Sequence, residues 1–122
     1  DKEGFEHFML KEIHEQPDVI RRTLSEYFNI THTGLHFRPL PFALENVSRL
    51  TIVACGTAFY AGMVAKYWFE NIARIPVELD IASEFRYRQP PMPKDGISLF
   101  ISQSGETADT LAAQAYVKSQ GQ

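Results

Sequence analysis

The sequence predicts an α/β fold in which a doubly wound parallel sheet follows an N-terminal helical segment. Residues 50–56 (LTIVACG) are nearly all apolar without alternation, which is typical of a strand covered on both faces. After residue 47, segments of strand and helix character alternate, an order that favours right-handed crossovers. Residues 5–13 place apolar side chains at three- and four-residue spacings, as amphipathic helices do. We therefore expect residues 1–46 to form a helical segment and connection, and residues 47–122 to form one globular unit.

The N-terminal segment is expected to contain two helices. The first covers residues 5–13, and Pro17 interrupts it because proline in a helix interior removes a hydrogen bond. Since proline fits the first turn of a helix, residues 16–18 (QPD) are expected to start the second one. Residues 29–46 show no stable period, which indicates a long surface connection. The apolar face of the second helix is expected to consist of Ile20, Leu24 and Phe28.

The alternating part of the chain is expected to contain three strands and three helices. In its second strand apolar residues alternate with Glu78 and Asp80, so we expect an outer strand with one wet face. A strand order of 2-1-3 places the switch point of the sheet between the first and third strands. The expected strands are residues 50–56, 77–82 and 97–102, and the expected helices are residues 57–73, 83–88 and 106–119. The inner face of the first of these helices is expected to consist of Phe59, Met63, Trp68 and Ile72.

Two polar, glycine-bearing strand ends flank this switch point, residues 55–57 (CGT) and 102–107 (SQSGET). Open sheets of this class bind ligands at the carboxyl ends of the flanking strands. The N–H groups of a helix start, together with nearby hydroxyls, suit an anion with several acceptor oxygens, such as a phosphate monoester. Gly105 lets the backbone approach such a ligand, and Thr57 adds a donor from the neighbouring strand. The hydroxyls of the second segment belong to Ser102, Ser104 and Thr107.

The polar residues also allow other interpretations. Serine and threonine before a helix are also ordinary N-caps. The patterns G-x-G-x-x-G and G-x-x-x-x-G-K-[ST] are absent, which argues against dinucleotides and nucleoside triphosphates and favours a sugar phosphate. Cys55 is expected in the core rather than as a nucleophile, and the four histidines lack metal-binding spacing, so neither cofactor nor metal is expected. The charged residues Glu84, Arg86 and Arg88 fit a solvated face or a contact with a ligand or second subunit.

The composition limits the classes of partner. The 122 residues carry a net charge of −3 with scattered lysines and arginines, which argues against nucleic acid or an anionic membrane. One cysteine cannot form an internal disulfide, and no apolar stretch approaches the roughly 20 residues that span a bilayer. The acidic start DKEGFEHFML does not look like a signal peptide. A cytoplasmic protein that binds a small molecule is expected.

Five ordered blocks resemble the isomerase (SIS) domain of the glutamine:fructose-6-phosphate aminotransferases, the glucosamine-6-phosphate synthases. The resemblance implies a flavodoxin-like parallel sheet between helices, with a serine- and threonine-rich loop that holds the phosphate of a hexose phosphate. The five blocks are residues 11–17 (KEIHEQP), 54–57 (ACGT), 67–70 (YWFE), 82–87 (ASEFRY) and 102–110 (SQSGETADT). On the family's pattern the sugar-phosphate-binding residues are Thr57, Ser102, Gln103, Ser104 and Thr107.

The resemblance also implies a reaction, in which ammonia released from glutamine by a separate N-terminal domain converts fructose 6-phosphate to glucosamine 6-phosphate. The family's catalytic glutamate, histidine and lysine come later in its chain, so no catalytic residue is assigned here. The 122 residues correspond to a domain truncated after its third strand of five, so we expect them to be inactive alone. The open edge of that third strand is expected to cause self-association, and the family resemblance implies a homodimer.

Two residues depart from the family's pattern. Ala58 stands where the family commonly has a serine, and His14 stands where it often has a tyrosine. Losing a hydroxyl at position 58 removes one candidate donor to the ligand. A non-catalytic SIS-type domain that senses a sugar phosphate is the alternative function, and a redox or nucleotide-binding domain is a third. Residues 11–17 favour the enzyme.

Overall fold

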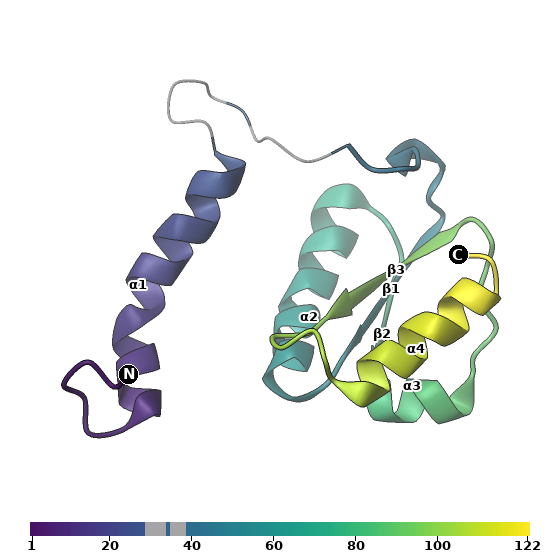
Figure 1. Ribbon diagram of the computed structural model, residues 1–122. Coiled ribbons are helices and arrows are strands. Elements are labelled where there is room, and N and C mark those ends of the chain that lie inside the picture. Colours follow the sequence, from purple (N-terminus) through teal and green to yellow (C-terminus); the bar gives the residue numbers. More distant parts are fainter. Residues whose placement is uncertain (29–33, 35–38) are drawn as a thin grey trace. The chain divides into compact units, whose positions relative to one another are not determined.

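The computed structural model describes residues 1–28, 34 and 39–122 (Figure 1). These residues form two compact units, Asp1–Pro41 and Phe42–Gln122. Half of the expected surface connection, at residues 29–33 and 35–38, lies outside the described residues. Near its end, Leu44–Asn46 form a short 3-10 helix, η1, where no regular structure was expected.

The described part of the first unit contains one long helix, α1 (Phe8–Tyr27), rather than two. Pro17 lies inside it, so the prediction of an interruption there is wrong. An interior proline costs roughly 3 kcal/mol, whereas helical ion pairs contribute only about 0.2–0.5 kcal/mol each. Such pairs flank Pro17, with Lys11 Nζ 3.6 Å from Glu15 before it and Arg21 bound to Asp18 after it. The ion pairs account for only part of this cost, and the helix nevertheless continues through Pro17 over 20 residues.

The apolar face predicted for the second half of α1 is exposed in its unit. Its residues are Ile20, Leu24 and Phe28, and no residue of α1 is buried.

Among the helices of the described ranges, none has the length and apolar character needed to cross a membrane.

The second unit is built on a three-stranded parallel sheet in the order β2-β1-β3, which confirms the predicted topology. Helix α2 covers one face of the sheet, and α3 and α4 cover the other (Figure 1). The strands are β1 (Arg49–Ala54), β2 (Val77–Ile81) and β3 (Gly96–Ile101). The helices are α2 (Gly56–Trp68), its π-helical continuation η2 (Phe69–Ala73), α3 (Ala82–Arg88) and α4 (Ala108–Ser119).

The central strand β1 supplies the core on both faces of the sheet. Ile52 and Val53 are fully buried and point to opposite faces, because side chains alternate along a strand. Val53 packs with α3 and α4 residues, including Phe85 and Val117. Ile52 belongs to the second cluster, against which Ala65 of α2 packs. This arrangement explains why the apolar run of β1 does not alternate.

The prediction for the inner face of α2 and η2 is wrong for three of its four residues. Phe59 is half-buried, but the other three are exposed. The helix contacts the sheet through Gly62, where an added Cβ would lie 3.0 Å from both Ile52 Cγ2 and Leu79 Cδ1. Small residues thus allow close approach, and the large apolar side chains lie on the outer face. The three exposed residues are Met63, Trp68 and Ile72.

An ion-pair network explains the wet face of the edge strand β2. Arg88 Nη2 donates to Glu78 at 3.1 Å and also to Asp80, and Arg49 lies 3.5 Å from Glu78. Charged side chains along an edge discourage pairing with another strand.

Glu70 in η2 links the end of helix α2 to the start of β2. Lys66 Nζ donates to Glu70 Oε1 at 2.9 Å, and the backbone N–H of Val77 donates to the same oxygen at 3.3 Å. The hydrogen bond from Lys66 is the main cause that lowers the pKa of Glu70, and the bond from Val77 is the second.

This link predicts a pH-dependent part of the stability. Because the pKa of Glu70 is lower in the folded chain, its contribution is present above the unfolded pKa of about 4.5 and is lost as the pH falls through the folded pKa. Urea unfolding between pH 7 and pH 3 should show Glu70→Gln less stable than wild type at pH 7, with the difference shrinking toward pH 3. Glu84→Gln, at an exposed position of α3, is the control. A difference that is constant over this pH range would contradict the prediction.

Candidate functional site

The carboxyl ends of β1 and β3 lie side by side, as the sequence predicted. Their last residues, Ala54 and Ile101, are paired in the parallel register. The chain therefore leaves both strands at the same end of the sheet, where α2 begins at Gly56 and residues 102–107 lead into α4 (Figure 1). We call residues 102–107 the hydroxyl loop.

The hydroxyl loop is folded by hydrogen bonds to its own serines. Ser102 Oγ accepts from the N–H of Gly105 at 3.0 Å and lies 3.2 Å from Thr107 Oγ1. Ser104 Oγ accepts from the N–H of Glu106 at 3.2 Å. Gly105 has φ +71°, a left-handed conformation that glycine adopts without strain. The serine side chains thus hold the turn that places the loop beside the start of α4.

Two helices begin at this end of the sheet without side-chain caps. The N-cap of α4 is Thr107 and that of α2 is Cys55, and neither side chain bonds to its helix's first turn in the described structure. Uncapped N–H groups and the aligned peptide dipoles give each helix start a partial positive charge. An anion at this end would face both helix starts.

The five residues predicted to bind the ligand differ in their burial and in their contacts with one another. Ser102 and Thr107 are half-buried and in contact with each other, whereas Ser104 is exposed on the same loop. Gln103 and Thr57 are exposed at the same end of the sheet. Within the described residues no hydrogen bond joins either of these two to the other three.

The structure also places the other candidate residues. Cys55 is half-buried and packs against the core cluster of Val53 and Phe85. Across the described ranges no three histidine, cysteine or acidic side chains gather as metal ligands, while His32 and His36 lie outside those ranges. Glu106, whose charge would repel a phosphate, has an exposed side chain.

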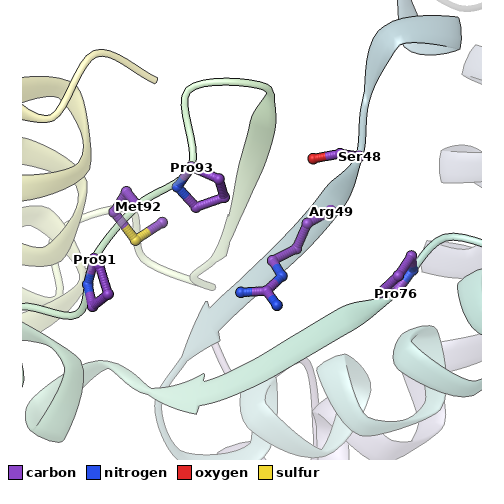
Figure 2. A pocket seen from close by; sticks show the side chains of 6 residues that line it. All are labelled: Ser48, Arg49, Pro76, Pro91, Met92 and Pro93. Carbon is purple, nitrogen blue, oxygen red and sulfur yellow. The ribbon is translucent and has the colours of Figure 1, made fainter.

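A pocket lies at the opposite, amino-terminal end of the strands. Figure 2 shows Pro91, Met92 and Pro93 on one side of it, with Ser48, Arg49 and Pro76 on the other. Arg49 in this pocket is already engaged with Glu78. Since open parallel sheets bind ligands at the carboxyl ends of their strands, the hydroxyl loop is the stronger candidate site.

Sequence reasoning missed an ion pair next to the hydroxyl loop. Arg86 Nη1 donates to Asp109 Oδ1 at 2.9 Å and so joins α3 to the first turn of α4. This hydrogen bond is the main cause that raises the pKa of the Arg86 guanidinium. The two residues lie on different helices, so their spacing along the chain gives no signal.

Residues 43–122 match the family model that is described as SIS domain. The chain is 57% identical over 122 residues to a glutamine-fructose-6-phosphate aminotransferase (isomerizing) of Bradyrhizobium diazoefficiens. It is 56% identical over 120 residues to the protein of the same name from Brucella abortus. The match covers 99% and 98% of this chain, respectively, but only 20% of each relative. The chain thus spans about a fifth of the length of these curated relatives.

A solved structure with a similar fold is the C-terminal domain of glucosamine-fructose-6-phosphate aminotransferase from Francisella tularensis. Its TM-score to this chain is 0.83 at 39% sequence identity. The similarity covers 99% of this chain and 34% of the solved one.

The left-handed backbone at Gly105 predicts the effect of substitutions there. A Cβ at this position would meet no atom within 4 Å, so Gly105→Ala should cost about 1 kcal/mol through backbone strain alone. Gly105→Asn should cost less, because asparagine tolerates the left-handed region better. Urea unfolding of the three proteins measures both differences. Equal losses for alanine and asparagine would show that the strain at this turn is not the cause.

Proposed function

The chain belongs to the SIS domain family, and on that premise we propose that its hydroxyl loop binds the phosphate group of a sugar phosphate. The observation that carries the proposal is the meeting of this loop with two helix starts that lack side-chain caps at one end of the sheet. The proposed ligand-binding residues are Thr57, Ser102, Gln103, Ser104 and Thr107.

The hydrogen bonds of the loop leave its hydroxyls able to donate to a phosphate. A serine hydroxyl that accepts from an N–H still carries its own hydrogen. Ser104 has this hydrogen available, and the pair of Ser102 and Thr107 uses only one of its two hydroxyl hydrogens between them. The hydrogen bonds from the backbone N–H groups of the loop orient the oxygens of Ser102 and Ser104, so these hydroxyl groups are positioned before the ligand binds. Hydrogen bonds to a charged group typically contribute about 1.5–3 kcal/mol each.

We further propose that the chain is the sugar-phosphate-binding part of the isomerase domain of an aminotransferase that makes glucosamine 6-phosphate. The substrates would be fructose 6-phosphate and ammonia derived from glutamine. Relatives with this enzyme's name are 57% and 56% identical over almost the whole chain, which favours the enzyme over a non-catalytic sensor. Because the chain spans about a fifth of these relatives, we propose that its residues bind the sugar phosphate without carrying out the reaction alone.

A titration followed by backbone amide chemical shifts tests the ligand and the site. Fructose 6-phosphate, glucosamine 6-phosphate and inorganic phosphate are each added to wild type, and we expect saturable shifts at residues 102–107. Ser104→Ala should weaken binding roughly ten- to a hundredfold, because one donor to a charged group is lost. Ala58→Ser should strengthen it, because a hydroxyl is added in the first turn of α2.

The matched control is Ser119→Ala, which removes a hydroxyl from the other end of α4. It should leave the affinity unchanged. Saturable shifts confined to other residues would refute the proposed site, and inorganic phosphate binding as tightly as the two sugar phosphates would refute recognition of the sugar.

We also propose that this 122-residue chain by itself self-associates through the open edge of β3. In the described sheet β3 pairs with β1 on one side only, so its other edge presents unpaired backbone groups. Light scattering after gel filtration should show wild type as a dimer or larger species. Leu99→Lys on β3 should shift it toward the monomer, because an edge charge opposes strand pairing. Leu111→Lys, which places the same charge at a more exposed leucine of α4, should not. A monomeric wild type would exclude this association.

A further inference from the structure

The ion pair between Arg86 and Asp109 lies beside the proposed phosphate site. Asp109 follows the N-cap residue Thr107 by two positions, so its carboxylate belongs to the first turn of α4. Arg86 reaches it from α3, with 2.9 Å between Nη1 and Oδ1. The side chains are 36% and 34% exposed, so solvent reaches the pair but does not surround it.

The carboxylate of Asp109 creates an electrostatic problem for an anion site. A negative side chain in the first turn is favourable for the helix, because it interacts with the positive helix start. The same interaction competes with a phosphate for that positive charge, and the two anions repel each other. One helical turn rises about 5.4 Å, which is shorter than the screening length of about 8 Å at physiological salt. An uncompensated Asp109 would therefore weaken phosphate binding.

Arg86 is held where it cancels this charge. Its guanidinium carbon lies 5.1 Å from the centroid of the Tyr87 ring, a distance at which a cation is attracted to the ring face. Helix α3 is fixed against α4 by buried contacts of Phe85 with Ala113 and Val117. The guanidinium remains protonated at any physiological pH, because the hydrogen bond that it donates to Asp109 raises its already high pKa.

The neighbouring arginine of α3 cannot take over this role. Arg88 donates to Glu78 and to Asp80 on the edge strand β2. Partly exposed ion pairs add little to stability. A contribution to the stability of the fold therefore explains little of why Arg86 and Asp109 are paired.

We propose that Arg86 is a positioning residue that neutralises Asp109, so that the start of α4 and the hydroxyl loop accept a phosphate dianion. This inference rests on the proposed function and adds a residue that does not itself touch the ligand. It makes a distinctive prediction, because the two partners of one ion pair should have opposite effects on affinity.

The test compares Arg86→Gln with Asp109→Asn, each of which breaks the same pair with little change of shape. Arg86→Gln leaves Asp109 uncompensated, so the Kd for fructose 6-phosphate and for inorganic phosphate should rise about three- to tenfold. Asp109→Asn leaves the Arg86 charge uncompensated, so both Kd values should fall. The double variant should bind close to wild type, as should Arg86→Lys, which keeps the charge. All of these differences should shrink as salt is raised from about 20 mM to 500 mM.

Thermal unfolding of the same variants separates this role from a structural one. A purely structural ion pair predicts that both single variants lose stability and affinity together, and that result would overturn the proposal while leaving the phosphate site intact. If wild type binds neither fructose 6-phosphate nor phosphate, the proposed function and this inference both fail. Opposite shifts of Kd with similar losses of melting temperature would support the proposal.

Discussion

The parallel pairing of β1 with β3 is the constraint on which the rest of the molecule depends. It sets Ala54 beside Ile101, and thereby brings the start of α2 and the hydroxyl loop to one end of the sheet. The pairing is held by a strand buried on both faces, since Ile52 and Val53 are each fully covered by helices on opposite sides. A slip of one residue would exchange these two side chains between faces and would misalign the strand ends. The core and the candidate site therefore share one register.

The sequence was sufficient for the sheet but not for the faces of its helices. The unbroken apolar run of β1 has one common explanation, burial on both faces, and it led to the correct strand order. Helix α2 is apolar on both sides, so its periodicity could not distinguish inside from outside. The face that packs is marked by Gly62, whose missing Cβ lets the helix approach Ile52 and Leu79, and a hydrophobic pattern does not register a missing side chain. The prediction at Pro17 is wrong because a single interior proline does not by itself end a helix of 20 residues.

At the candidate site the sequence points to residues with hydroxyl groups, but it does not indicate which hydrogen bonds these groups make within the loop. The sequence predicts that the serines donate hydrogen bonds to a ligand. In the structure the hydroxyl oxygens of Ser102 and Ser104 also accept hydrogen bonds from backbone N–H groups of their own loop. Along the chain, Glu106 is the charge nearest the serines. The structure shifts attention to Asp109, because its partner Arg86 lies on another helix, 23 residues away. Contacts between helices depend on packing, and packing is what a single sequence specifies least directly.

The source of positive charge at this site is the fold itself. The chain has a net charge of −3, and the donors of the hydroxyl loop are neutral, so neither the overall charge nor the side chains attract an anion strongly. In a parallel sheet with helical crossovers, however, every helix that follows a strand begins at the carboxyl end of the strands. The starts of α2 and α4 therefore add their dipoles at the same place. Because such partial charges are small, a single full charge nearby can strengthen or cancel them, and under the proposed function the pairing of Asp109 with Arg86 therefore bears directly on the affinity for an anion.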